Sequence, residues 1–181
     1  MATPEQIARI RLLVTDVDGV LTGGAVIYGT GQVELKAFNI KDGLGIRLAT
    51  WGGLPVVFLT GRSSEAVARR AADVGAAVVQ GATDKDARLR VLARDHGVTL
   101  DEIAYVADDL NDLPALRLVG LPIAVADAVP EVLALAAHTT TAPGGHGALR
   151  EVIELILRTQ QRWDAAVDTY LTRIRGAHVG Q

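Results

Sequence analysis

Two aspartates, Asp16 and Asp18, lie two residues apart directly after an apolar run at positions 12–14. If that run is a strand, residues at i and i+2 point to the same side of it, and Gly19 permits a sharp turn immediately afterwards. Two close carboxylates repel each other unless a cation or a shared proton separates them. The pair therefore predicts a Mg²⁺ site in which one carboxylate is a nucleophile and the other carries a proton. The alternative is an ordinary turn, in which Asp and Gly are common.

Two further groups of polar residues follow apolar runs. Thr60, Gly61 and Arg62 offer a hydroxyl, a backbone amide and a guanidinium ahead of an expected helix, which is a combination that can hold a phosphate. Lys85 lies at an expected helix start, where its charge opposes the helix dipole. That local conflict indicates a role in neutralising a phosphate or orienting a carboxylate. A capped loop and a solvated surface lysine are the alternatives.

An acidic run, Asp108-Asp109-Leu110-Asn111-Asp112, follows another apolar stretch. Three carboxylates in five residues at a strand end suit oxygen coordination of a hard cation, although the spacing is not that of a calcium-binding loop. The alternative is a helix start made favourable by acidic residues.

Apolar, β-branched runs alternate with amphipathic stretches along the chain, which predicts βαβ units in the α/β class. Right-handed crossovers would place helices on both faces of a Rossmann-like, doubly wound parallel sheet. Ser63, Thr83 and Pro130 are expected at helix starts, with the last of these helices ending near His138, and one C-terminal helix is expected over about 147–175. The expected core strands are Leu12–Thr15, Pro55–Leu59, Ala77–Val79, Ile103–Val106 and Ile123–Val125.

Residues 24–38 interrupt this alternation with two apolar runs around Gly29-Thr30-Gly31, which predicts a β-hairpin. Since the hairpin directly follows the aspartate pair, it would be a flap that overhangs the site. The alternative is an antiparallel extension of the main sheet. No repeat or linker interrupts the chain, so we expect a single domain over residues 1–181.

The composition limits the possible functions. Hydrophobic residues make up 49% and charged residues 22% of the chain, which is typical of a globular protein. The absence of cysteine excludes disulfides, thiolate metal sites and cysteine nucleophiles. A net charge of −3 argues against a nucleic-acid partner, and neither a signal peptide nor a membrane-spanning run is expected. We therefore expect a cytoplasmic protein.

The ordered set of DxD, Thr, Lys and DDxxD resembles the four motifs of the haloacid dehalogenase superfamily. LLVTDVDGVLTGG, ELKAFNIKDGLGIR, AYVADDLNDLP, AVADA and GGHGALRE resemble its small, cap-less sugar-phosphate phosphatases. The resemblance covers roughly residues 11–157. It implies a domain without a cap that hydrolyses a sugar phosphate, 3-deoxy-D-manno-octulosonate 8-phosphate being the first expectation and a nine-carbon sialic-type acid 9-phosphate the alternative.

The resemblance also implies roles for the motif residues. Asp16 would attack phosphorus and form an aspartyl-phosphate, and Asp18 would protonate the leaving oxygen and then activate water. The carboxylates of Asp16 and Asp108 and the backbone carbonyl of Asp18 would hold Mg²⁺. Thr60 and Lys85 would hold phosphoryl oxygens. The residues that would orient these groups are Asp109 and Asp112.

Substrate contacts implied by the resemblance come from the segment after the hairpin and from basic side chains. Two departures from the family pattern, Lys41 in place of arginine and His146 in place of a basic residue, leave the sugar open. A homotetramer is implied, with the hairpin and the C-terminal segment at its interface. The expected substrate-binding residues are Asp18, Asn39, Ile40, Lys41, Asp42, Gly43, Arg47, Gly61, Arg62, Arg70 and Lys85.

A phosphoacceptor signalling domain of the receiver type is the alternative from another functional class. Such domains also combine aspartates, a hydroxyl and a lysine on a doubly wound sheet. They do not need an acid two residues after the phosphorylated aspartate, however, and their acidic residues precede the acceptor strand. Asp18 and the acidic run after Lys85 therefore favour the enzyme, and the complete motif set also disfavours a catalytically silent assembly subunit.

Overall fold

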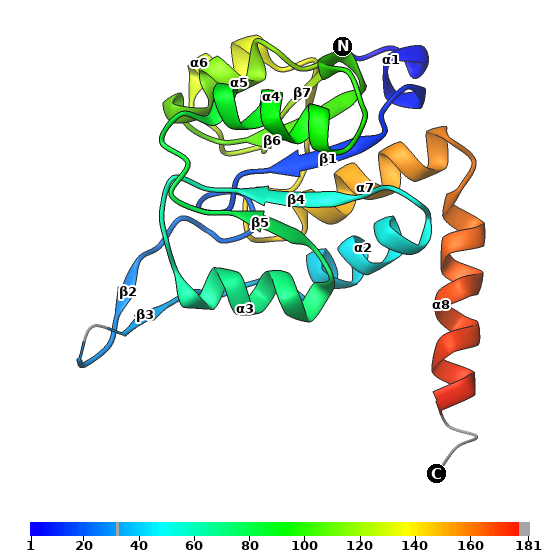
Figure 1. Cartoon of the computed structure of the whole chain (residues 1–181), viewed down its shortest axis with the longest axis horizontal. Coiled ribbons are helices and arrows are strands. Elements are labelled where there is room, and N and C mark those ends of the chain that lie inside the picture. Colours follow the sequence, from blue (N-terminus) through cyan, green and yellow to red (C-terminus); the bar gives the residue numbers. More distant parts are fainter. Residues whose placement is uncertain (32, 178–181) are drawn as a thin grey trace.

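Six parallel strands form the central sheet in the order β5-β4-β1-β6-β7-β8 (Figure 1). The computed structural model describes residues 1–31 and 33–177. The predicted doubly wound parallel sheet is confirmed. The strands are β1 (Leu12–Thr15), β4 (Val56–Leu59), β5 (Ala77–Val79), β6 (Ile103–Ala107), β7 (Leu121–Ala124) and β8 (His138–Thr139).

Helices cover both faces of this sheet. One face carries α2 (Ile40–Trp51), α3 (Glu65–Val74) and α7 (Ala148–Thr159), and the other carries α4 (Lys85–Asp95), α5 (Leu113–Leu116) and α6 (Pro130–Leu135) (Figure 1). Within the described part of the chain, no helix is both long enough and apolar enough to cross a bilayer. The remaining helices are α1 (Pro4–Ala8), α8 (Trp163–Ala177) and two 3₁₀ turns at Leu100–Glu102 and Leu110–Asp112.

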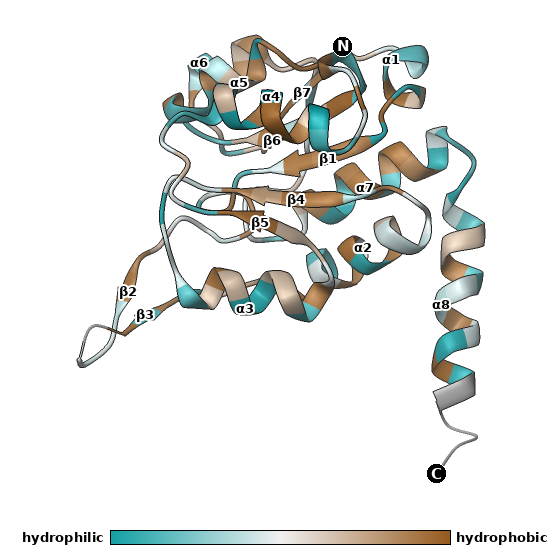
Figure 2. Ribbon diagram, in the orientation of Figure 1, coloured by the Kyte–Doolittle hydropathy of each residue, from teal (hydrophilic) through white to brown (hydrophobic). Residues whose placement is uncertain are grey.

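The core strands β1, β4 and β6 are buried along their whole length, as expected of parallel strands covered on both faces. Their residues are mostly hydrophobic (Figure 2). β1 pairs with β4 on one side and with β6 on the other. The chain leaves β1 towards β4 and later returns to β6, so the strand order reverses between β1 and β6. Open α/β sheets bind ligands at the carboxyl ends of the strands that flank such a point.

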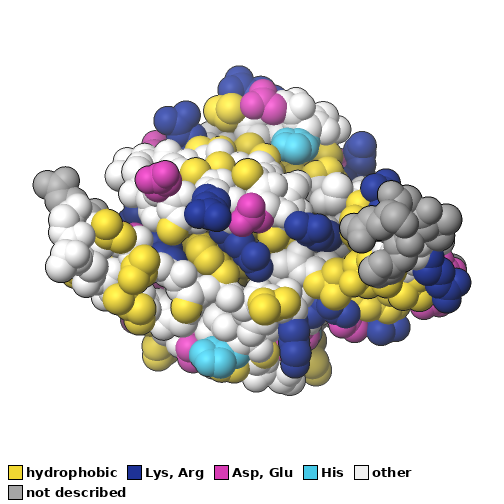
Figure 3. All heavy atoms as spheres, turned by 90° about the horizontal axis from the view of Figure 1, so that it is seen from below, with side chains coloured by type: hydrophobic (Ala, Val, Ile, Leu, Met, Phe, Trp, Pro, Cys, Tyr) yellow, Lys and Arg dark blue, Asp and Glu magenta, His cyan; other side chains and the backbone are white. Residues whose placement is uncertain are grey.

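The predicted hairpin forms a separate two-stranded sheet of β2 (Ile27–Tyr28) and β3 (Glu34–Leu35), and it projects from the body of the molecule (Figure 1). The hairpin is therefore not an extension of the main sheet. Hydrophobic side chains lie exposed on this hairpin, at the left of Figure 3. They include Val26, Ile27, Tyr28, Val33 and Leu35.

The segment predicted as one C-terminal helix over about 147–175 is divided into α7 and α8. Gln161 adopts a positive φ of 56°, which ends the first helix, and the Arg162 N–H donates to the Leu157 carbonyl. The Gln160 side-chain amide anchors this turn by donating to the Ala8 carbonyl at the end of α1, at 3.2 Å, and to the Ile10 carbonyl beyond it, at 2.7 Å. The sequence pattern missed the break because the apolar positions continue through it.

The helix that begins at Pro130 ends at Leu135 rather than near His138, since Ala136 is already extended. His138 belongs instead to β8, a two-residue strand that pairs with β7 and that was not predicted. Two other helix starts are displaced by one residue from the expected Ser63 and Thr83. The N-cap residues are Ser64 and Asp84.

Candidate active site

A cleft with a volume of about 380 Å³ opens at the carboxyl ends of β1, β4 and β6. It brings together residues that are nearly one hundred positions apart in the sequence, because these three strands are neighbours in the sheet. Its lining residues are Asp16, Asp18, Gly24, Thr60, Gly61, Arg62, Asp108, Asp109 and Asn111.

Three carboxylates meet at the base of this cleft. One oxygen each of Asp16, Asp108 and Asp112 lies within 4.8 Å of the other two. Asp16 and Asp112 are buried and Asp108 is half-buried. Gly19 permits this approach, since it has a φ of +93° and a Cβ at its position would overlap the Asp108 carboxylate. The turn after β1 thus requires glycine, both for its positive φ and for the space that the Asp108 carboxylate occupies.

The electrostatics of these carboxylates favour a bound cation. Burial, with repulsion from Asp112, raises the pKa of Asp16 to about 7. Burial, with repulsion from Asp16, likewise raises the pKa of Asp108 to about 7. Among the described residues, Asp108 Oδ1 and Asp112 Oδ2 are buried without a hydrogen-bond partner. Clustered, unsatisfied carboxylate oxygens are ligands that suit Mg²⁺.

Lys85 neutralises part of this negative charge. Its ammonium lies 3.0 Å from Asp16 Oδ1 and 2.5 Å from Asp112 Oδ1, and its side chain is only 2% exposed. Burial disfavours the ammonium, but Asp16 and Asp112 outweigh that effect and hold the pKa of Lys85 above its usual value. The Tyr105 hydroxyl also donates to Asp112 Oδ1, at 2.6 Å. Tyr105 was not predicted as a site residue, because its position within an apolar run is typical of a core residue of β6.

Asp112 and Asp109, both expected to orient other groups, have different surroundings. Asp112 holds Lys85 and Tyr105 from a fully buried position. Asp109 is exposed, and its carboxylate accepts from the Leu110 N–H at 2.7 Å as the cap of a 3₁₀ turn.

The phosphate-holding residues predicted after β4 lie at the cleft wall. Thr60 is buried, and its hydroxyl accepts from the Arg62 N–H at 3.2 Å. The Arg62 guanidinium is half exposed and donates to Glu34 of the hairpin at 2.5 Å. Thr60, Gly61 and Arg62 therefore share the cleft with the aspartates, as their positions after a strand predict.

Two hairpin residues at this site were missed by the sequence analysis. Lys36 donates to Asp18 Oδ1, and Glu34 contacts both Lys36 and Arg62. The sequence does contain a signal, because Glu34 and Lys36 alternate with Val33 and Leu35, so that one side of the strand is charged and the other apolar.

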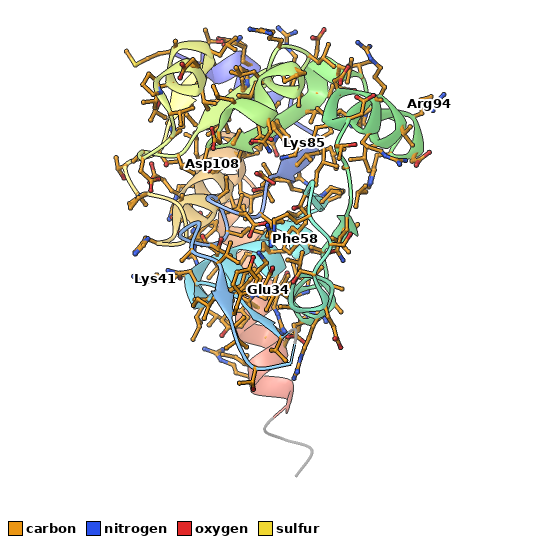
Figure 4. All side chains as sticks on the ribbon, turned by 90° about the vertical axis from the view of Figure 1, so that its left-hand side faces the viewer. Glu34, Lys41, Phe58, Lys85, Arg94 and Asp108 are labelled. Carbon is orange, nitrogen blue, oxygen red and sulfur yellow. The ribbon has the colours of Figure 1, made fainter. Side chains whose placement is uncertain are left out.

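The segment Asn39–Gly43 opens α2, and among the described residues it does not line the cleft. Asn39 donates to the Gly145 carbonyl at 3.3 Å, and the buried Asp42 accepts from the Arg150 N–H at 2.7 Å. Lys41 lies at the edge of the molecule, away from Lys85 and Asp108 (Figure 4). The substrate contacts expected from Asn39, Ile40, Lys41, Asp42 and Gly43 stay predictions.

Arg47 and Arg70 also lie outside the lining of the cleft as the structure describes it. Arg70 donates to the Asn39 carbonyl at 3.0 Å and stacks over Phe38, and Arg47 donates to the Asp73 carbonyl at 2.5 Å. His146 lies with its Nδ1 2.7 Å from the Gly144 carbonyl oxygen. The substrate roles of Arg47 and Arg70 stay predictions as well.

Known proteins are similar to this chain in sequence. Residues 73–151 match the family described as haloacid dehalogenase-like hydrolase. The chain is 42% identical over 158 residues to the 3-deoxy-D-manno-octulosonate 8-phosphate phosphatase KdsC of Escherichia coli strain K12, covering 87% of this chain and 84% of that protein. The chain belongs to the haloacid dehalogenase-like phosphatases.

Solved structures of this family agree closely with the fold. The 3-deoxy-D-manno-octulosonate 8-phosphate phosphatase from Moraxella catarrhalis, in complex with magnesium ion, phosphate ion and KDO molecule, is 40% identical with a TM-score of 0.88. The alignment covers 92% of this chain and 97% of that chain. The Yersinia pestis phosphatase of the same name is 40% identical with a TM-score of 0.87, over 89% and 88% of the two chains. Because the chain belongs to this family, it is a phosphatase, and its cofactor is Mg²⁺.

Proposed function

We propose that this chain is a Mg²⁺-dependent phosphomonoesterase that hydrolyses 3-deoxy-D-manno-octulosonate 8-phosphate through an aspartyl-phosphate on Asp16. The observation that carries the proposal is the meeting of Asp16, Asp108 and Lys85 at the base of one cleft, with Asp18 on its wall. The likeness to phosphatases of this substrate supports the choice of sugar.

In the first step an Asp16 carboxylate oxygen attacks phosphorus, the phosphorus–oxygen bond to the sugar breaks, and Asp18 gives a proton to the leaving oxygen. Lys85 keeps Asp16 in place through its 3.0 Å contact and adds positive charge near the phosphoryl oxygens. Thr60 and Gly61 offer a hydroxyl and an amide at the cleft wall.

In the second step water attacks the phosphorus of the aspartyl-phosphate, Asp18 takes its proton, and the Asp16–phosphorus bond breaks to release phosphate. Asp16, Asp108 and the backbone carbonyl of Asp18 are the groups that would hold Mg²⁺. When bound, the cation offsets the repulsion between a carboxylate and a phosphate dianion and stabilises charge in the transition state.

The substrate is tested by measuring phosphate release from 3-deoxy-D-manno-octulosonate 8-phosphate, a nine-carbon sialic-type acid 9-phosphate and glucose 6-phosphate. We expect the highest kcat/KM for the first, no turnover in EDTA, and recovery when Mg²⁺ is added in excess. A higher kcat/KM for the nine-carbon ester would replace the proposed sugar, and turnover without a divalent cation would contradict the mechanism.

We further propose a homotetramer in which the hairpins meet. The exposed side chains of Ile27, Tyr28, Val33 and Leu35 support this, because a lone two-stranded hairpin is only marginally stable. The C-terminal segment after Ala177, also expected at the interface, lies outside the described residues. Sedimentation equilibrium of the full chain should give a mass four times that of the 19.0 kDa monomer. A monomeric mass would contradict the assembly.

A further inference from the structure

The β3 arm of the hairpin has two sides of opposite character. Glu34 and Lys36 are two residues apart and point to one side, while Val33 and Leu35 point to the other. Leu35 is 53% exposed, whereas the side chain of Lys36 has no exposed surface. The charged side of the hairpin therefore lies against the body of the molecule.

Four charged side chains form a closed network on that side. Lys36 donates to Asp18 Oδ1 and lies 3.0 Å from Glu34 Oε1. Arg62 donates to Glu34 Oε2 at 2.5 Å, and its Nε lies 3.9 Å from Asp18 Oδ2. Each cation lies between two carboxylates. The two cations differ in access, because the Arg62 side chain is 47% exposed and can meet a ligand, whereas that of Lys36 is enclosed.

An enclosed ammonium is retained only when carboxylates compensate for its lost hydration. Burial on its own would lower the pKa of Lys36, but hydrogen bonds to Asp18 and Glu34 outweigh it and hold that pKa above its usual value. Lys36 is thus a charged side chain whose ammonium is paired with two carboxylates. Its Nζ contacts Asp18 and Glu34, and the enclosed side chain leaves it no access to substrate.

The contact with Lys36 gives the two carboxylate oxygens of Asp18 different surroundings. Oδ1 accepts from Lys36, while Oδ2 has no hydrogen-bond partner among the described residues. Asp18 lines the cleft. The χ2 torsion of an aspartate is broad, so a carboxylate without such a contact would present either oxygen in many orientations.

We propose that Lys36 is a positioning residue for Asp18, which by holding Oδ1 presents Oδ2 to the leaving oxygen of the phosphate ester. The inference rests on the proposed function. As the Asp16–phosphorus bond forms and the ester bond breaks, the proton on Asp18 Oδ2 passes to the leaving oxygen, and Lys36 keeps all of its protons. The hairpin thereby takes part in proton transfer although none of its atoms touches phosphorus.

The test is the dependence of kcat/KM on the leaving group in wild type, Lys36→Met and Asp18→Asn. Phosphate esters of an alkyl alcohol, phenol and 4-nitrophenol are compared, because 4-nitrophenolate departs without a proton whereas an alkoxide does not. Lys36→Met should lower kcat/KM about 10- to 100-fold for the alkyl ester and less than about threefold for the 4-nitrophenyl ester. Asp18→Asn should show the same pattern more strongly.

Two comparisons separate positioning from a purely structural role. Lys36→Arg, which keeps charge and donors, should recover most of the activity on the alkyl ester, and adding Lys36→Met to Asp18→Asn should cost little more. Lys36→Gln provides the same leaving-group comparison should the methionine variant not fold. An equal loss on all three esters, or fully additive losses, would overturn the role of Lys36. A wild type inactive on all three esters and on the sugar phosphates would overturn the proposed function itself.

Discussion

Asp16→Asn is expected to lower phosphate release by a factor on the order of 10⁴ or more, because the amide cannot form the aspartyl-phosphate. The fold should survive. Asn keeps an oxygen that can accept from Lys85, and the substitution removes one of three mutually repelling carboxylates. In metal-free buffer near pH 7 the unfolding midpoint should therefore equal or exceed that of wild type.

Phosphate release and thermal unfolding measured on the same preparations check this expectation. Asp95→Asn is the matched control, since Asp95 is exposed at the end of α4, and it should leave both quantities unchanged. Retention of most of the activity by Asp16→Asn would contradict the covalent mechanism. A large fall in its unfolding midpoint would mean that Asp16 stabilises the fold.

The sequence predicted the central sheet well, because parallel strands buried on both faces are continuous apolar runs. Four of the expected strands match β1, β4, β5 and β6 to within one residue at either end. The short β8 was missed, since two residues give no periodicity and its pairing with β7 depends on the tertiary fold. The break between α7 and α8 lies where Gln160 donates to the Ala8 and Ile10 carbonyls, a tertiary contact that a local pattern does not contain.

The candidate site was predictable where it depends on strand ends and less so elsewhere. Asp16, Thr60 and Asp108 each follow a neighbouring strand, so their convergence follows from the topology alone. The contact between Lys36 and Asp18 depends on how the hairpin folds back, and chain pattern alone does not fix that angle. The position of Asn39–Gly43 outside the cleft lining likewise follows from where α2 begins.

Lys85→Met is expected to destabilise the chain by about 3–5 kcal/mol and to abolish turnover. The substitution leaves Asp16 and Asp112 buried without the ammonium that lies 3.0 and 2.5 Å from them, and orphaned buried charges carry penalties of this size. Denaturant unfolding in EDTA measures the loss. Arg90→Met is the matched control, because Arg90 is exposed on the same helix and should change the free energy of unfolding by less than about 0.5 kcal/mol.

The stability lost in Lys85→Met should grow as pH rises above about 7, the pKa of native Asp16 and Asp108. The pKa values of native Asp16 and Asp108 are about 7, against an ordinary value of 3.8. Between about pH 4 and 7 the native state therefore binds more protons than the unfolded state, and the contribution of these groups to the free energy of unfolding falls as pH rises. Lys85 opposes both upward shifts, so its removal should raise both pKa values further and extend that fall to higher pH. A loss independent of pH would contradict this origin.

Removing a second charge should separate electrostatics from packing. In Lys85→Met combined with Asp112→Asn, one orphaned carboxylate is gone while the Tyr105 hydroxyl keeps a partner at position 112, so part of the lost stability should return. Activity should not return, because the ammonium beside Asp16 is still missing. If the double variant were instead less stable than Lys85→Met by the full cost of Asp112→Asn alone, the lysine would stabilise the fold through packing rather than through its charge.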